Sequence, residues 1–174
     1  MQLYRAESAG PSKDRKLTPR ITSTAKALFG IYLLLTVACT LSYFAAGMSP
    51  FDALCHAFST VAIGGFSTHD ASLGYYEENA ILLVSSLFML FSAINFGLHF
   101  VALQRRTARV YARDSETAFF VTVIALATVV TCSLLLTTET LGVEDSLIHG
   151  FFQTISIATT TGFTTQDFSI WPLF

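Results

Sequence analysis

Three long apolar blocks, each without a charged side chain, set the main constraint on how this chain can fold. They run from Ala27 to Ala46, from Ala80 to Leu103 and from about Thr117 to Thr138. A helix needs about 20 apolar residues to cross the hydrocarbon core of a bilayer, and each block is long enough. Only 13% of the 174 residues are charged and 52% are hydrophobic, which is too apolar a balance for an ordinary soluble domain. The sequence therefore predicts an all-α integral membrane protein.

The charged residues are distributed unevenly along the chain. All ten basic residues lie in two windows, Arg5 to Lys26 and Arg105 to Arg113, and most of the acids lie in the other connecting segments. The positive-inside rule places the basic windows in the cytoplasm and the acidic segments outside. Residues 1–26 then form a cytoplasmic connector and residues 105–116 a cytoplasmic basic loop. The basic windows adjoin membrane spans and contain few aromatic residues, so we expect no nucleic acid partner. The second window can anchor the span at the anionic inner leaflet or dock a cytosolic regulator.

The chain also repeats itself at an offset of 97 residues. Six identities in fourteen positions indicate duplication: Ser59, Gly65, Phe66, Thr68, Asp70 and Ser72 align with Ser156, Gly162, Phe163, Thr165, Asp167 and Ser169. Residues 27–104 form one complete unit, and residues 117–174 form a second unit that stops after its loop. Because both units enter the membrane in the same direction, we expect parallel repeats of outer helix, re-entrant pore helix with loop, and inner helix.

A short helix is predicted inside the loop that joins the first two blocks. Ser49 suits an N-cap, Pro50 suits the first turn, and Asp52 suits the positive end of the helix dipole. The helix ends near Thr60, too short to span a bilayer, so the chain must return as irregular backbone over Val61 to Ser67. The second unit repeats this, with a helix from Asp145 to about Ala158 and a return over Thr159 to Thr164.

Irregular backbone at membrane depth is tolerated where it is buried in protein or lines a water-filled cavity. Rings of backbone carbonyl oxygens can replace the hydration shell of potassium, and glycine permits the positive φ that turns neighbouring carbonyls the same way. The pore helices also point their negative dipole ends at these stretches. Tight extracellular turns are the alternative. The candidate potassium ligands are the backbone carbonyls of Ile63, Gly64, Gly65, Thr160, Thr161 and Gly162.

Other polar side chains admit two interpretations each. Asp70 and Asp167 follow the two aligned glycines by five residues, and they either concentrate cations at the outer mouth or are solvated loop acids. Asn95 and His99 are four residues apart in the second block, so on one continuous helix they share a face, for helix packing or for ion contact. The histidines and cysteines show no metal-ligand spacing, and no catalytic grouping can be assembled. We therefore expect no enzyme and no bound cofactor.

Three segments resemble one known family. The sequences HAFSTVAIGGFSTHDASLGYY (His56 to Tyr76), ATTTGFTT (Ala158 to Thr165) and MQLYRAE at the start are similar to the membrane subunit of the bacterial Trk potassium-uptake system, in the superfamily of the Ktr and plant HKT proteins. The resemblance covers essentially the whole chain. It implies potassium uptake across the bacterial cytoplasmic (inner) membrane by four pore-loop units around a central pore, of which this chain is a fragment holding the second and third.

The resemblance further implies a homodimer and a cytosolic nucleotide-binding Trk regulatory subunit. Channel-like transport and symport with another ion both fit this pattern. The alternative from a different class is a non-conducting membrane scaffold or receptor, whose outer loops bind a partner through residues such as Glu77 and Glu78.

Overall fold

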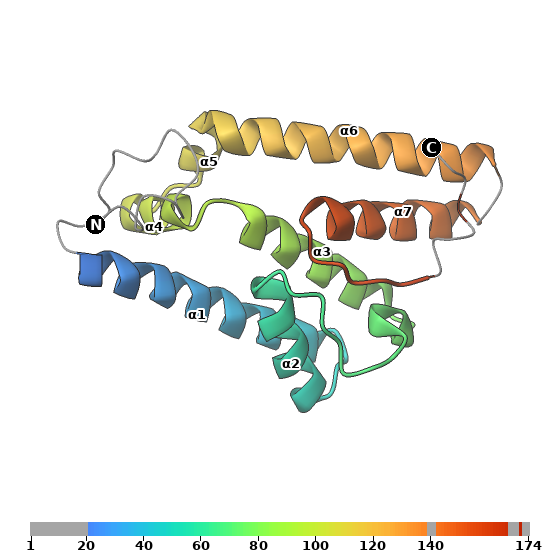
Figure 1. Cartoon of the computed structure of the whole chain (residues 1–174), viewed down its shortest axis with the longest axis horizontal. Coiled ribbons are helices and arrows are strands. Elements are labelled where there is room, and N and C mark those ends of the chain that lie inside the picture. The colour runs from blue at the N-terminus through green and yellow to red at the C-terminus, as the bar shows by residue number, and fades with distance from the viewer. Residues whose placement is uncertain (1–20, 139–141, 167–170, 172–174) are drawn as a thin grey trace.

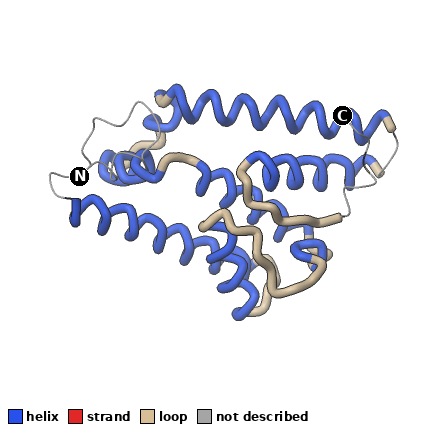
Figure 2. The backbone as a smooth tube through the Cα atoms, viewed as in Figure 1, coloured by secondary structure: helices blue, strands red, loops and turns tan. Residues whose placement is uncertain are grey.

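The computed structural model describes residues 21–138, 142–166 and 171 of the chain. Within these ranges the protein consists of helices joined by loops and contains no strand (Figure 2). The N-terminal part of the connector, Asp167 and Ser169 lie outside the described residues. The helices in chain order are α1 (Ile21–Ala45), α2 (Pro50–Val61), the 3-10 turn η3 (Ser72–Tyr75), α3 (Asn79–Ala93), α4 (Phe96–Arg105), α5 (Arg109–Arg113), α6 (Ser115–Thr137) and α7 (Val143–Ala158).

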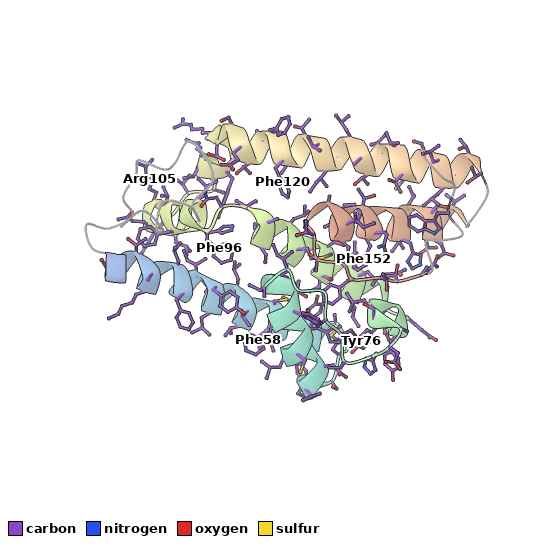
Figure 3. The ribbon with its side chains drawn as sticks, in the orientation of Figure 1. Phe58, Tyr76, Phe96, Arg105, Phe120 and Phe152 are labelled. Atoms are coloured by element: carbon purple, nitrogen blue, oxygen red, sulfur yellow. The ribbon has the colours of Figure 1, made fainter. Side chains whose placement is uncertain are left out.

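Helices α1 and α6 are each long and apolar enough to cross a membrane, over Ser23–Ala45 and Ser115–Thr137. Their positions agree with the first and third apolar blocks. They run in the same direction in Figure 1, which agrees with the predicted parallel arrangement of the two units. Apolar side chains project outward along α6 (Figure 3), and Phe119, Leu126 and Val129 remain more than 60% exposed. Such a surface suits contact with lipid or with further membrane helices.

The second apolar block does not form the continuous helix that the sequence predicts. It is broken into α3 and α4, whose axes meet at 94°. The break falls at Ile94 and Asn95, where the Asn95 side chain accepts a 2.8 Å hydrogen bond from the backbone N–H of Gly97 and so caps α4. The block is long and apolar enough for a span, but its composition does not tell whether the helix is continuous.

The bend is held by His99, and this corrects the predicted shared face of Asn95 and His99. One His99 ring nitrogen, Nε2, lies 2.9 Å from the carbonyl oxygen of Phe91, across the break, and Nδ1 lies 2.8 Å from the Tyr111 hydroxyl. His99 is only 4% exposed. It therefore joins α3, α4 and α5, while Asn95 acts before α4 begins. Both side chains have structural partners within the helical bundle.

The hydrophobic core lies where α1, α2, α3 and α7 pack together, around fully buried side chains such as Tyr43, Met89 and Phe152. Buried polar contacts lie within it, among them the hydrogen bonds of Thr60. The Thr60 hydroxyl donates to the carbonyl oxygen of His56 (2.7 Å), so the Tyr43 hydroxyl is the donor in its 2.7 Å bond to Thr60 Oγ1. This bond ties α1 to α2 beside the irregular loop. The three cysteines are free thiols, and two of them, Cys39 and Cys132, are buried.

The ends of the molecule differ in charge. The start of α1, the end of α4, α5 and the start of α6 gather at one end in Figure 1, and the start of α3 lies at the opposite end. The basic residues of these segments therefore share one end. They are Lys26, Arg105, Arg106, Arg109 and Arg113. The acidic pair Glu77 and Glu78 directly precedes α3 at the other end.

Candidate functional site

The two short helices α2 and α7 begin differently. At α2, Ser49 Oγ accepts a 3.2 Å hydrogen bond from the backbone N–H of Asp52 and donates a 2.8 Å bond to the Asp52 carboxylate, with Pro50 in the first turn. The predicted start at Ser49 is therefore confirmed. Helix α7 begins after Gly142 without a side-chain cap, and Glu144 and Asp145 in its first turn complement the helix dipole. Both helices end within one residue of the predicted positions.

The C-terminal ends of α2 and α7 are the same structural motif. In each, two backbone N–H groups fold back onto the last turn in the Schellman pattern, which satisfies carbonyls that the helix leaves without partners. The four bonds correspond pairwise at an offset of 97 residues: Ile63 N to Thr60 O (3.1 Å) with Thr160 N to Ile157 O (2.9 Å), and Gly64 N to Ser59 O (2.7 Å) with Thr161 N to Ser156 O (2.9 Å). The duplication seen in the sequence is thus a duplication of backbone geometry.

The positions that adopt positive φ differ in part from those the sequence indicates. Gly65 (+68°) and Gly162 (+86°) do so as expected, but Gly64 does not, and its place is taken by Ile63 (+54°), with Thr160 (+63°) in the second unit. A β-branched residue in the left-handed region is a strained outlier that costs on the order of 1–3 kcal/mol. Ile63 and Thr160 are candidate ligands from the sequence, but positive φ at these two positions was not indicated because glycine is the usual residue in that region. The sequence signal for positive φ was the position of these two residues, which directly follow the C-cap residues of α2 and α7.

The two irregular loops touch each other through Gly65. A Cβ atom on Gly65 would overlap the carbonyl oxygen of Thr161 and would lie 3.2 Å from the carbonyl carbon of Gly162. Glycine is therefore required at Gly65 by space as well as by φ, whereas a Cβ on Gly162 would meet nothing within 4 Å. Among the candidate residues, the structure brings Gly65 of the first unit against Thr161 and Gly162 of the second. Figure 2 shows the loops that follow α2 and α7 beside one another.

Side chains of the pore helices hold each loop as it leaves the candidate residues. In the first unit, the Thr68 hydroxyl donates a 2.7 Å bond to the Asp52 carboxylate. In the second, Thr165 Oγ1 lies 2.9 Å from His149 Nδ1. These two pairs are again related by the offset of 97 residues, although an acid has been replaced by an imidazole. The sequence alone does not reveal this correspondence because the paired residues are 16 positions apart.

The first of these pairs has a clear electrostatic consequence. Hydrogen bonds from Thr68 and Ser49 hold the pKa of the Asp52 carboxyl below its usual value, and the neighbouring His69, whose Nε2 lies 3.6 Å from Asp52 Oδ1, acts in the same direction. His69 in turn stacks on Tyr75, with ring centroids 3.7 Å apart. This cluster links α2 to the turn η3 on the side of the loops where Asp70 lies exposed.

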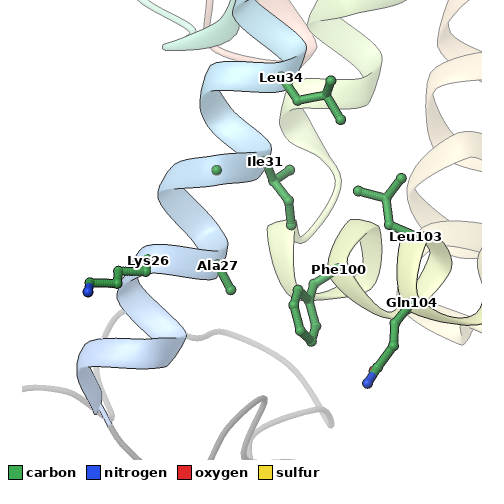
Figure 4. A pocket seen from close by; sticks show the side chains of 8 residues that line it. Lys26, Ala27, Ile31, Leu34, Phe100, Leu103 and Gln104 are labelled. Atoms are coloured by element: carbon green, nitrogen blue, oxygen red, sulfur yellow. The ribbon is translucent and has the colours of Figure 1, made fainter.

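One hollow on the surface lies away from these loops. It has a volume of about 400 Å³ and separates the first half of α1 from α4 (Figure 4). Apolar side chains such as Ile31, Leu34 and Phe100 face it, and Lys26 and Gln104 lie at its edge. It brings together no titratable cluster. Over the described part of the chain, no group of three or more His, Cys, Asp or Glu side chains could hold a metal ion.

These features define a class: a helical membrane protein in which short helices and irregular loops alternate with apolar spans. The chain belongs to the TrkH family, described as a cation transport protein, whose family model matches residues 1–174. Members of this family transport ions and are not enzymes, which confirms the prediction that the chain has no enzymatic role.

Curated relatives and a solved structure agree with this assignment. The chain is 54% identical over 172 residues to the Trk system potassium uptake protein TrkH of Halomonas elongata, covering 99% of this chain and 36% of that protein. It is 50% identical to TrkH of Escherichia coli, covering 100% and 36%. The crystal structure of the potassium transporter TrkH from Vibrio parahaemolyticus superimposes with a TM-score of 0.86 at 49% identity, over 89% of this chain and 34% of that chain. The chain thus spans about a third of the length of these relatives.

Proposed function

We propose that this chain is part of a longer protein, here called the full-length parent, that takes up potassium across the bacterial inner membrane. The chain supplies the second and third of four pore-loop units. Support comes from membership of a cation transport family. It also comes from relatives named as potassium uptake proteins, about a third of whose length this chain matches. The alternative of a non-conducting scaffold explains neither the duplicated loops nor these relatives.

The observation that carries this proposal is the alternation of φ along both loops. Positive φ at Ile63 and Gly65 brackets Gly64, and positive φ at Thr160 and Gly162 brackets Thr161. In an ordinary strand, successive groups alternate between opposite sides. Alternation of the backbone between left-handed and right-handed regions instead lets successive carbonyls face one axis, as a carbonyl-lined filter requires. The potassium ligands proposed here are the carbonyls of Ile63, Gly64, Gly65, Thr160, Thr161 and Gly162.

The strain at Ile63 and Thr160 fits this role. A flexible glycine at either position would relieve the backbone but would also let the carbonyl rotate away. A β-branched side chain has few allowed conformations, so the Schellman bonds and the side chain together leave one orientation. A filter that must distinguish ions of different radius benefits from carbonyls that are held in place.

The remaining parts of the proposal concern surroundings and partners. The basic end of the molecule, with Lys26 and Arg105, faces the cytoplasm, and the loops face the periplasm. Asp70 and Asp167 attract cations to the outer mouth. A homodimer of the full-length parent works with a cytosolic nucleotide-binding Trk regulatory subunit.

The test is rubidium uptake by potassium-transport-deficient bacteria that carry the full-length parent, with potassium and sodium as competitors. Wild-type parent should restore uptake that potassium inhibits far more strongly than sodium. Gly65→Ser and Gly162→Ser should weaken this preference, while Gly30→Ala, a change on an α1 surface with nothing within 4 Å, should leave it unchanged. No uptake by the wild type, or unaltered selectivity in both serine variants, would refute the proposal.

A further inference from the structure

The turn η3 belongs to the first unit, yet two of its residues form hydrogen bonds with the loop of the second unit. The backbone N–H of Gly74 donates a 3.1 Å hydrogen bond to the carbonyl oxygen of Thr164. The backbone N–H of Thr164 donates in turn to Ser72 Oγ at 3.3 Å. Both backbone groups of Thr164, two residues beyond Gly162, are therefore bound by η3.

Gly74 is suited to this contact by its size. Its φ is not positive, so glycine is not needed for backbone conformation. A Cβ atom there would instead overlap the carbonyl oxygen of Thr165 and would lie 3.0 Å from the Thr165 carbonyl carbon. Any larger residue must therefore push the second loop away from η3. The other side of Thr165 is already held by its hydroxyl contact with His149, so the loop cannot yield freely.

Ser72 is held in an unusual conformation that serves the same contact. Its φ is +53°, in the left-handed region, and its N–H donates a 2.9 Å bond to the carbonyl oxygen of His69. A non-glycine residue in this region is strained, and the conformation persists only where surrounding contacts determine it. The next residue, Leu73, is fully buried and anchors the turn in the core.

The turn is also fixed to the pore helix of its own unit. Tyr75 stacks on His69 at a 7° interplanar angle, and His69 Nε2 lies 3.6 Å from the Asp52 carboxylate at the start of α2. A continuous set of contacts thus runs from α2, through η3, to the backbone just beyond Gly162.

We infer that Ser72 and Gly74 are positioning residues for the filter segment of the neighbouring unit, and so determine potassium selectivity without contacting the ion. This inference rests on the proposed function. Together with the contact between Gly65 and Thr161, the two bonds to Thr164 fix where the second loop stands relative to the first. The distance between carbonyls of different units is what a filter must control, and contacts within one unit cannot set it.

The experiment measures competition of potassium and sodium with rubidium uptake, in cells carrying full-length parent with Ser72→Ala, Gly74→Ala or both. Uptake is normalised to the amount of folded protein extracted from membranes. Each single variant should lower the potassium-over-sodium preference by about two- to tenfold, the range expected when one net hydrogen bond is lost. Gly30→Ala is the matched glycine control, and Ser133→Ala, whose exposed hydroxyl donates to the Val129 carbonyl within α6, is the matched serine control.

A purely structural role gives a different result. Fewer folded molecules with an unchanged selectivity ratio would overturn the inference. If Gly74→Ala does not assemble, Ser72→Ala decides alone, because it removes only a hydroxyl. A wild-type parent without selective uptake would instead refute the proposed function, so the two failures are distinguishable.

Discussion

The two aligned glycines, Gly65 and Gly162, have different surroundings, and this difference is measurable. Gly162→Ala should lower the free energy of unfolding by about 1–2 kcal/mol, because alanine is strained at the positive φ of this position although its Cβ has free space. Gly65→Ala should cost about 1–3 kcal/mol more, because its Cβ must also displace the Thr161 carbonyl. Thermal unfolding of the purified full-length parent in detergent measures both. Gly30→Ala should raise stability by about 0.5–1 kcal/mol, as a helical glycine in open space. Equal losses for the two loop variants would contradict the close approach of the loops.

The pair formed by Asp52 and Thr68 predicts a dependence on pH. Because its hydrogen bonds lower the pKa of Asp52 below 3.8 in the folded state, the stability they contribute is fully present above that value. It is lost as the pH falls through the lowered pKa. Thr68→Val should therefore cost about 0.5–1.5 kcal/mol near pH 7 and progressively less below about pH 4.

A double-mutant cycle with Asp52→Asn isolates this interaction, with unfolding of the full-length parent followed at several pH values. The matched control is Thr122→Val in α6, whose hydroxyl donates to the Ala118 carbonyl on the exposed surface. Its cost should not vary with pH. A Thr68→Val penalty that persists unchanged below pH 3 would show that the carboxylate is not involved.

At the scale of secondary-structure elements, the bend between α3 and α4 depends on His99. His99→Leu removes the contacts to Phe91 and Tyr111 together, and we expect a cost of about 1–3 kcal/mol. Tyr111→Phe removes one of them and should cost about 0.5–1.5 kcal/mol. Thermal unfolding of the full-length parent compares the two. If His99→Leu were the milder change, the bend would have to be fixed by packing alone.

The elements that could be predicted from sequence are those determined by neighbouring residues. Ser49, Pro50 and Asp52 specify the start of α2 by local capping chemistry, and the structure agrees. The bend in the second apolar block could not be predicted, because no proline marks it. Its sequence signals are only Asn95, a good N-cap residue, and Gly97 two positions later. A single N-cap residue inside an apolar block is a weak indication of a break, because hydropathy averaged over a window hides it.

At the scale of the whole molecule, the alignment of two glycines was sufficient to locate both irregular loops, but not to show how they meet. The hydrogen bond from Thr164 to Ser72 joins residues 92 positions apart, and the approach of Gly65 to Thr161 joins residues still farther apart in sequence. No local rule encodes such contacts. Similarly, the correspondence of Asp52 with His149 was hidden by their different chemistry. Repetition in the sequence predicts the architecture of each unit, whereas the interface between the units depends on contacts between residues far apart in the chain.

The final prediction concerns the 174-residue chain studied by itself. In the proposed filter, carbonyls from four units must surround the ion on all sides, and this chain supplies two of those four units. The backbone around Ile63 and Thr160 would then face lipid or another chain, at a cost of several kcal/mol for each polar group left without a partner. The ring would stay open even though the contact of Gly65 with Thr161 is made within the chain. We expect the purified chain in liposomes to give no potassium flux above that of empty vesicles. Full-length parent, reconstituted in the same way, should give a potassium-selective flux. A reproducible potassium-selective current from the chain alone would show that two units can assemble into a complete filter without the other two.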